Sequence, residues 1–578
     1  MKTQTKIITA AKMIHIDSLI LDEFFKENKD FFENAKVQKI QQPTRREIIL
    51  QMRKFSENGA DVRKFYININ PEYHHICFMN KETEKRRCLE IPKQPPMFCM
   101  LLRKHMEGAK ILYAQKPENE RILELYFENY NEIGDRIEEC LSIELMGKHS
   151  NIVLYNTDNN IILGCAHNIG AEKSKERELA GGLPYIYPPK QNKKKLLQTR
   201  FDWFESALLK SEDSIKKAIS SRYFSLSQIL VEDICKVKNI DSDKQAKSIT
   251  KEEAQILFIE LHEFMEKETH IFSVSQNYEK YSCIEKLERQ YNSVNELIDD
   301  YFSYHIEKNI ISGLKTGLNT KINKELKKLN NTLRSQQKQI DKEEKAKNYM
   351  LKGNLLTANA YALKTGEKSV LLKDYDPGKM IEIDLDENLT PIENANRYFA
   401  LYNKTKKACQ IANEMSEATK NEIDYFKEIQ YNAEIAASIE ELKETVQELE
   451  SEKPQEKNKK QKETINIEKR EIDGFIVYIG KNHKQNDYLY SKISSPNDLW
   501  FHALNTPGSH IIAKNQNRAD EIQSSTLLKI AKLAKEFSSA KNSSKVPVVY
   551  TQRKYIKRPQ NTKSGFVVYK NETEIVVN

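Results

Sequence analysis

The spacing of apolar residues divides the chain into regions of different character. Residues 13–195 contain short segments in which apolar and polar side chains alternate, such as 47–53, 64–70 and 141–147. A period of two is typical of strands in a sheet with one buried face. Residues 200–285 show the three- and four-residue spacing of short amphipathic helices instead. We therefore expect a β-rich N-terminal domain followed by a helical region.

Residues 286–455 carry a narrow apolar stripe at coiled-coil spacing. The stripe has two stretches, and its positions are Leu326, Leu329, Leu333, Gln336 and Ile340, then Ile435, Ile439, Leu442, Val446 and Leu449. Two such helices joined by a compact insert predict an antiparallel arm with a small tip at about 353–389. A helix of about 60 residues would be roughly 90 Å long.

Two local signals lie near this tip. The segment YDPG at 375–378 favours a turn between two short strands. Thr390, Pro391 and Glu393 predict the start of the second long helix, because they match a capping box with proline in the first turn.

After a charged linker at 451–463, the alternating pattern returns in residues 467–578, with one amphipathic helix expected at 519–537. This pattern predicts a small α/β unit. The whole chain is thus expected to be a multidomain α+β protein, and its 578 residues are too many for one core.

Composition and charge narrow the cellular setting. The net charge of +8 is modest, and the eight cysteines form no C-x-x-C pair. No apolar run is long enough for a signal peptide or a membrane span. These features predict a cytoplasmic protein with reduced thiols and no membrane partner.

The clearest charge signal lies between Lys541 and Lys570, where eight lysines and arginines occur without any Asp or Glu. Tyrosines and a phenylalanine alternate with them. Cations that neutralise phosphates and rings that stack on bases suit a nucleic-acid surface. The alternative is a solvated basic loop whose aromatic rings belong to the core.

The stretch DLWFHALNTPGSH contains Asp498, His502 and Ser509, the residue types of a hydrolase triad. There is no G-x-S-x-G motif, and a triad is defined by geometry rather than by neighbours in sequence. We favour a strand in which Trp500 and Phe501 point to opposite faces, so no catalytic residue is expected.

A zinc site is a further alternative, because five metal-ligating side chains occur at His74, His75, Cys77, Cys88 and Cys99. Their spacing fits no common zinc site. Phosphate-binding and dinucleotide-binding glycine motifs are also missing from the sequence. We therefore expect neither a metal nor a cofactor.

Several segments together resemble the NFACT family. They are PPMFCMLLRKHMEG at 95–108, LPYIYPP at 183–189, KGNLLTANAYALKTG at 352–366 and DLWFHALNTPGSHIIAK at 498–514. The resemblance implies four parts: a glycosylase-like N-terminal domain at 13–195, a helix-hairpin-helix-like region at 200–285, a coiled-coil arm at 286–455 and an RNA-binding NFACT-R domain at 467–578.

The resemblance also implies a function. Family members bind large ribosomal subunits, through rRNA and ribosomal proteins, when these are obstructed by peptidyl-tRNA. They recruit alanyl-tRNA, and the stalled chain receives a non-templated alanine tail that marks it for degradation. The ribosome would form the peptide bond, so the protein itself is not expected to be an enzyme. It would be cytoplasmic and ribosome-associated.

The family's tRNA-binding residues fall at Asp17 and at Glu120-Arg121, where glutamate replaces the family's aspartate. Without the resemblance, Glu120 and Arg121 would be expected to form an exposed ion pair. A second departure is Ser225, where the family has a glycine, so a turn with positive φ would be strained. The expected RNA contacts of the C-terminal domain are Trp500, His502, Arg553, Lys554, Lys557 and Arg558.

Two other functions are considered. A fibronectin-binding surface adhesin, an older name in the same family, would require export, for which the sequence carries no signal. A DNA glycosylase would use an N-terminal proline as nucleophile, and none follows Met1 or Met13.

Overall fold

The computed structural model describes residues 16–578 except 58, 131–132, 173–176, 268–269, 376–377, 451–466, 516–521 and 559–566. It divides into two compact units, Met1–Ile310 and Ile311–Asn578. Both α and β elements occur in each unit, which confirms a multidomain α+β protein.

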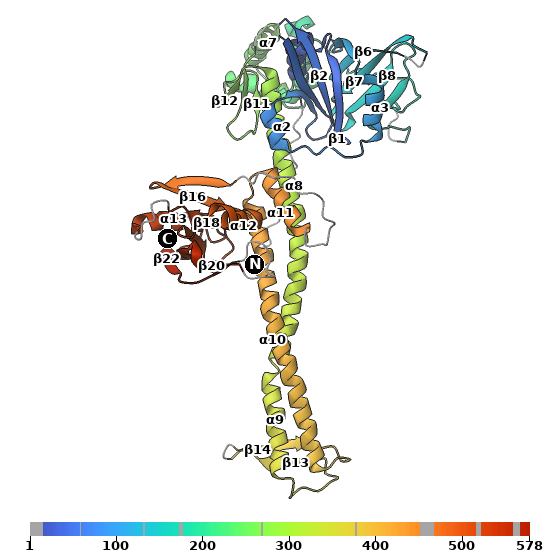
Figure 1. The fold of residues 1–578 in the computed structure, drawn as a ribbon. Helices are drawn as coiled ribbons and strands as arrows, with labels where there is room; N and C mark the ends of the chain where they lie inside the picture. The colour runs from blue at the N-terminus through green and yellow to red at the C-terminus, as the bar shows by residue number, and fades with distance from the viewer. Residues whose placement is uncertain are drawn as a thin grey trace. The chain divides into compact units, whose positions relative to one another are not determined.

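The first unit is built on an antiparallel sheet (Figure 1). The sheet has nine strands in the order β4-β3-β2-β1-β5-β6-β7-β8-β9. Helices α1 (Ser18–Phe32) and α3 (Met97–Met106) pack on it. The strands are β1 (Lys36–Thr44), β2 (Glu47–Ser56), β3 (Gly59–Asn68), β4 (His75–Met79), β5 (Lys110–Gln115), β6 (Ile122–Tyr130), β7 (Arg136–Glu144), β8 (Asn151–Asn156) and β9 (Ile162–Cys165). The alternating segments of the sequence thus form strands as expected.

A helical region follows the sheet. It contains α4 (Phe201–Leu209), α5 (Ile215–Arg222), α6 (Gln228–Val237) and α7 (Lys251–Glu266), and it ends in a small sheet of β10 (Phe272–Val274), β11 (Tyr281–Ser282) and β12 (Arg289–Tyr291). Ser225, in the turn between α5 and α6, has φ of +61°. The strain expected at this position is therefore present, because a side chain disfavours the left-handed region.

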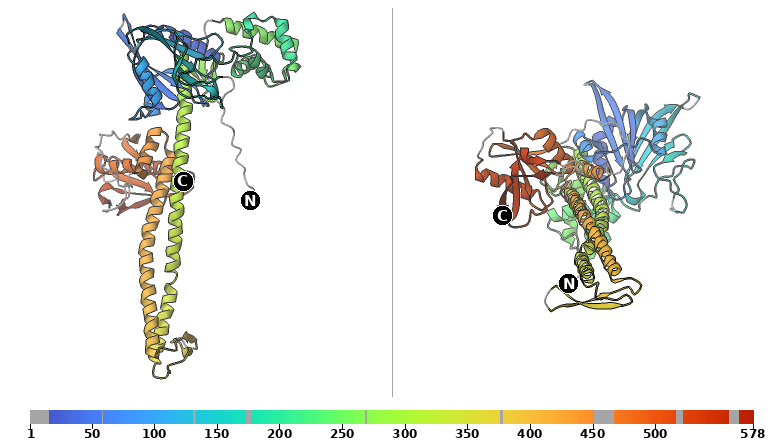
Figure 2. Two further views of the ribbon diagram at one scale, coloured as in Figure 1. Left: turned by 90° about the vertical axis from the view of Figure 1, so that its right-hand side faces the viewer. Right: turned by 60° about the horizontal axis from the view of Figure 1, so that its bottom comes forward.

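The second unit contains a long helical hairpin (Figures 1 and 2). Helix α8 (Val294–Ile340) runs into this unit from the first, α9 (Glu343–Ala358) follows it, and α10 (Pro391–Ile435) returns alongside. Leu318 and Ile322 of α8 share a core with Phe426 and Ile429 of α10. At the far end, Gly353 lets α9 approach α10 closely, because a Cβ atom there would lie 2.9 Å from the Phe399 ring.

The returning side of the hairpin is interrupted, whereas one continuous helix was expected. Helix α10 ends at Ile435, and a separate helix, α11 (Ile439–Glu450), places Leu442 in the same core as α8 and α10. The second apolar stripe therefore covers two helices rather than one. The longest helix has 47 residues instead of the expected 60 or so.

Both signals near the tip appear in the structure. Strands β13 (Ser369–Lys373) and β14 (Met380–Asp384) form a hairpin, although Asp376 and Pro377 of its turn lie outside the described residues. The capping box is confirmed. The backbone N–H of Glu393 donates to Thr390 Oγ1 at 3.3 Å, and that of Thr390 donates to Glu393 Oε2 at 2.7 Å.

The C-terminal part of this unit is a six-stranded sheet with the order β15-β16-β18-β17-β19-β22. Helix α13 (Ser524–Glu536) packs on one face, and a second core around Trp500 fills the other. The strands are β15 (Glu468–Ile472), β16 (Phe475–Gly480), β17 (Leu499–Ala503), β18 (His510–Ala513), β19 (Val546–Gln552) and β22 (Thr573–Val577). Short elements α12 (His483–Tyr488), β20 (Ile556–Lys557) and β21 (Val568–Tyr569) flank the sheet.

Candidate nucleic-acid interface

Arg121 lies where the turn after β5 enters β6. Its carbonyl accepts a hydrogen bond from the backbone N–H of Leu145 at 2.8 Å, so the backbone at Arg121 is anchored to the end of β7. Glu120 precedes it in the same turn, and both side chains are half-buried. The sheet therefore holds Glu120 and Arg121 at the start of β6.

Asp17 is the N-cap of α1 and is only 8% exposed. Its Oδ1 accepts from the backbone N–H of Ile20 at 2.9 Å, and its Oδ2 accepts from the Tyr281 hydroxyl at 3.1 Å. Both oxygens thus serve the fold of the first unit. This cap explains why a short acidic side chain suits the position.

The structure brings Asp17, Glu120 and Arg121 close enough to interact electrostatically. Burial lowers the pKa of Arg121, while Asp17 and Glu120 raise it in part. Burial raises the pKa of Glu120, against the effect of Lys116, Arg121 and Lys190. The three residues carried over from the family therefore belong to one site, although they are far apart in sequence.

Sequence reasoning missed Lys193, which joins this site. Burial lowers its pKa, and the neighbouring Arg121 lowers it further. We call Asp17, Glu120, Arg121 and Lys193 the Arg121 cluster. The only signal in the sequence was the lysine run at 193–195, which was interpreted as a domain boundary.

The two cations of the Arg121 cluster have no internal anion bound to them. Within the described part of the chain, neither the Arg121 guanidinium nor the Lys193 ammonium forms a hydrogen bond or an ion pair. The expected Glu120–Arg121 ion pair is likewise not formed. Two half-buried cations that interact electrostatically repel each other, and an external phosphate or carboxylate would relieve this repulsion.

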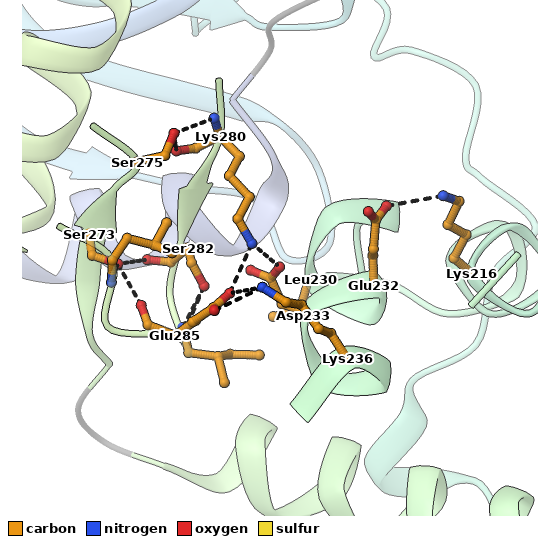
Figure 3. Close-up of polar contacts among 12 residues, drawn as sticks. Lys216, Leu230, Glu232, Asp233, Lys236, Ser273, Ser275, Lys280, Ser282 and Glu285 are labelled. Carbon is orange, nitrogen blue, oxygen red and sulfur yellow. Dashed lines mark hydrogen bonds and ion pairs between the residues drawn. The ribbon is translucent and has the colours of Figure 1, made fainter. Parts of the chain in front are cut away.

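A polar network joins β11 to α6 (Figure 3). The Lys280 ammonium donates to Asp233 Oδ1 at 3.2 Å and to Glu285 Oε2 at 2.9 Å, and Ser282 Oγ accepts from the backbone N–H of Glu285 at 2.9 Å. These contacts fix β11 against α6. Because Tyr281 lies in β11, the same network positions the hydroxyl that holds Asp17.

A groove of about 1130 Å³ opens elsewhere on the first unit, between α3 and β9. Arg45, Lys104 and Lys148 are among its lining residues, and the Arg121 cluster is not. This groove and the Arg121 cluster are therefore separate features.

In the C-terminal domain, Trp500 does not lie on the surface. It is 2% exposed and packs against His502, His510 and Tyr569. A ring this buried cannot stack on a base, so the structure assigns Trp500 to the core and corrects its expected role as an RNA contact. His502 is half-buried, and its Nε2 lies 3.2 Å from the Gly508 carbonyl.

The four predicted basic contacts fall into two kinds. Arg553 donates to the Tyr490 carbonyl at 3.0 Å and covers the Tyr490 ring at 3.8 Å, and Arg558 pairs with Asp487 at 3.0 Å. Lys554 and Lys557 are exposed. Lys557 is therefore free to meet a phosphate, whereas the arginines already have internal partners. The Lys554 ammonium lies 5.1 Å from the centre of the Tyr555 ring but remains exposed. Lys563 lies outside the described residues.

The structure does not support a hydrolase triad at this corner. Asp498 accepts from Lys514 at 2.7 Å and from the backbone of Ser495 at 2.6 Å, rather than from His502. The Ser509 hydroxyl is buried and has no hydrogen-bond partner among the described residues.

The histidines and cysteines considered for zinc do not gather. His75 stacks on the Phe302 ring at 4.4 Å, and burial lowers its pKa to about 3. Cys77 lies 3.8 Å from Asp299 and Cys99 lies 3.8 Å from the Ile40 carbonyl. Across the described residues these side chains form no common site.

Comparisons with known proteins cover nearly the whole chain. A family model described as NFACT N-terminal and middle domains matches residues 17–465, and one described as NFACT protein RNA binding domain matches residues 466–571. The Rqc2 homolog RqcH of Bacillus subtilis is 30% identical over 94% of this chain and 94% of that protein. The protein of the same name from Streptococcus pneumoniae is 28% identical over 97% of both.

Solved structures give a weaker likeness. The N-terminal part of a fibronectin/fibrinogen-binding protein from Streptococcus suis aligns with a TM-score of 0.39 and 24% identity, over 50% of this chain and 98% of that one. None of the described helices is long and apolar enough to span a membrane.

Proposed function

Because the chain belongs to the NFACT family, we propose that it is a ribosome-associated quality control factor. It would bind large ribosomal subunits that are obstructed by peptidyl-tRNA and recruit alanyl-tRNA, so that the stalled chain receives a non-templated alanine tail. Relatives named Rqc2 homolog RqcH support this proposal over almost the full length. The observation that carries it is the pair of unpartnered cations in the Arg121 cluster.

The chemistry of the Arg121 cluster suits recognition of tRNA. A guanidinium can hold two phosphate oxygens, or the edge of a guanine, through parallel hydrogen bonds. Lys193 adds a second charge at the same place, and the Glu120 carboxylate can orient the guanidinium or accept from a base amine. Half-burial strengthens each contact, because nearby water screens it less.

The proposed role is positioning rather than catalysis. The ribosome would form each peptide bond, and the protein would hold the incoming tRNA in place. Lys554 and Lys557 of the C-terminal domain would contribute phosphate contacts to RNA. A glycosylase-like first domain and a helix-hairpin-helix-like second region remain predictions from the family resemblance.

The test is to purify the tagged full chain from cells and to sequence the RNA that co-purifies. We expect alanine tRNA together with RNA of the large subunit. Arg121→Ala should lose most of the tRNA and keep the subunit RNA. The matched control is Arg136→Ala, since Arg136 is an exposed strand arginine that is already paired with Glu128 at 3.1 Å.

Two outcomes would overturn the proposal. Undiminished tRNA with Arg121→Ala would remove the Arg121 cluster as the tRNA site. Protein found mainly on the cell surface, and absent from large-subunit fractions, would favour the fibronectin-binding adhesin instead.

A further inference from the structure

His502, His510 and Glu428 meet within the second unit. His502 lies in β17, His510 opens β18, and Glu428 lies on α10. One ligand atom from each lies within 4.8 Å of the others. In the described part of the chain, this is the one group of three or more His, Cys, Asp or Glu side chains arranged to hold a metal ion. We call it the two-histidine cluster.

The sheet explains why the two histidines face each other. Strands β17 and β18 pair antiparallel, with Trp500 opposite Ile512 and Phe501 opposite Ile511. The same register places His502 opposite His510, and directly opposed side chains lie on the same face of a sheet. Their ring centroids are 5.3 Å apart. The indole of Trp500 covers both rings, at 5.7 Å from His502 and 5.3 Å from His510.

The surroundings resemble the outer shell of a metal site. The Nε2 atom of His502 lies 3.2 Å from the Gly508 carbonyl, and a ring nitrogen that donates to a carbonyl leaves the other nitrogen with its lone pair. Glu428 lies beside a third histidine, with His483 Nε2 3.4 Å from Glu428 Oε2. The other nitrogen of His483 lies 3.4 Å from Glu448 Oε1. A histidine placed beside a carboxylate in this way can orient it as a metal ligand.

We propose that the two-histidine cluster binds a divalent transition-metal ion, for which zinc is the natural probe. Two imidazoles and one carboxylate form a donor set that zinc accepts, with a fourth position left for water. Zinc–ligand bonds of about 2.0–2.1 Å place tetrahedral ligand atoms about 3.3 Å apart. Modest side-chain rotations would bring the three ligand atoms, now within 4.8 Å of one another, to that separation. Because Glu428 belongs to the arm and the histidines to the RNA-binding domain, the ion would fasten that domain to α10.

Tryptophan fluorescence offers a local test, because the chain has only two tryptophans, Trp203 and Trp500. In full-length Trp203→Phe protein, excited at a wavelength that tyrosine does not absorb, Trp500 is the only emitter. Bound cobalt quenches a nearby indole, so cobalt should quench Trp500 emission, and zinc should restore it by displacing the cobalt. In Trp500→Phe protein, the emission of the exposed Trp203 should not respond.

Variants then locate the ligands. In the Trp203→Phe background, His510→Ala and Glu428→Gln should each weaken cobalt affinity roughly 100-fold, and His483→Ala should weaken it about 10-fold through the outer shell. His149→Ala is the matched control, since His149 is an exposed histidine of the first unit and should change nothing. Circular dichroism checks that each variant is folded.

The eight cysteines could bind zinc elsewhere, so the coordination must also be read directly. An X-ray absorption spectrum of the zinc-loaded wild-type protein should show nitrogen and oxygen donors with two imidazoles. Sulfur ligation would overturn the proposal, and so would a Trp500 emission that does not respond to cobalt. Unchanged cobalt affinity in both His510→Ala and Glu428→Gln would overturn it as well. The spectrum keeps the proposal testable even if a variant fails to fold.

Discussion

The cations of the first unit and those of the C-terminal domain differ in what they contact. Arg121 and Lys193 form no hydrogen bond or ion pair in the described structure, whereas Arg553 and Arg558 contact Tyr490 and Asp487. In the sequence, the C-terminal segment carried the stronger charge signal. The density of basic residues therefore does not measure how many of them are available to RNA. Internal pairing decides this, because a cation held by its own fold must give up those contacts before it binds elsewhere.

The largest effect is expected for Arg121. Arg121→Ala should weaken binding of purified alanyl-tRNA roughly 10- to 100-fold, since hydrogen bonds to charged groups are worth about 1.5–3 kcal/mol. Because the Arg121 guanidinium forms no hydrogen bond or ion pair in the described structure, the free energy of unfolding should change by less than about 0.5 kcal/mol. Filter binding and denaturant unfolding measure the two quantities. A large loss of stability would show that Arg121, like Arg553, is a structural residue.

For Asp17 we expect a larger effect on stability than for Arg121. Asp17→Ala removes the α1 cap and the hydrogen bond from Tyr281, so the free energy of unfolding should fall by about 2 kcal/mol. Tyr281→Phe should cost about half as much, since it removes one of these bonds. Denaturant unfolding of both variants measures this. Wild-type stability in Asp17→Ala would contradict the capping role and leave Asp17 with RNA contact alone.

Arg553 and Lys557 separate stability from RNA binding within one segment. Arg553→Ala should lower the free energy of unfolding by about 1–2 kcal/mol, because Arg553 donates to the Tyr490 carbonyl and packs on its ring. Lys557→Ala should leave stability unchanged and reduce the slope of log affinity for RNA against log salt by about 1. Denaturant unfolding of both variants measures stability, and RNA binding at several salt concentrations measures the slope. Equal slopes for wild type and Lys557→Ala would exclude a phosphate contact at Lys557.

The smallest effect is expected at Ser225. Ser225→Gly should raise the free energy of unfolding by about 0.5–1 kcal/mol, because glycine adopts a φ of +61° without strain. Ser221→Gly, an exposed helical site only four residues away, should lower it by a similar amount. Thermal unfolding of the two variants gives the comparison. Destabilisation in both would mean that the turn at Ser225 is not strained.

Features that depend on neighbours in sequence were predictable. The alternating segments become strands of the nine-stranded sheet, and Thr390 and Glu393 form their capping box. Each of these patterns involves only residues a few positions apart in sequence. Ser225 also adopts the strained conformation that its position in the turn implied. The break after Ile435 was missed, since the apolar spacing continues unchanged across it into α11.

Pairings across the fold were decided only by the tertiary structure. The family resemblance named Asp17 and Arg121, but only the packing of α1 against the sheet brings them together and adds Lys193. The expectation of no metal site came from spacing along the chain, whereas Glu428 meets His502 and His510 only when α10 packs against the C-terminal sheet. The sequence by itself determined the elements, the net charge and the family. The fold decided which charges are paired and which are left to bind a partner, because ion pairs and metal ligands depend on distance in space.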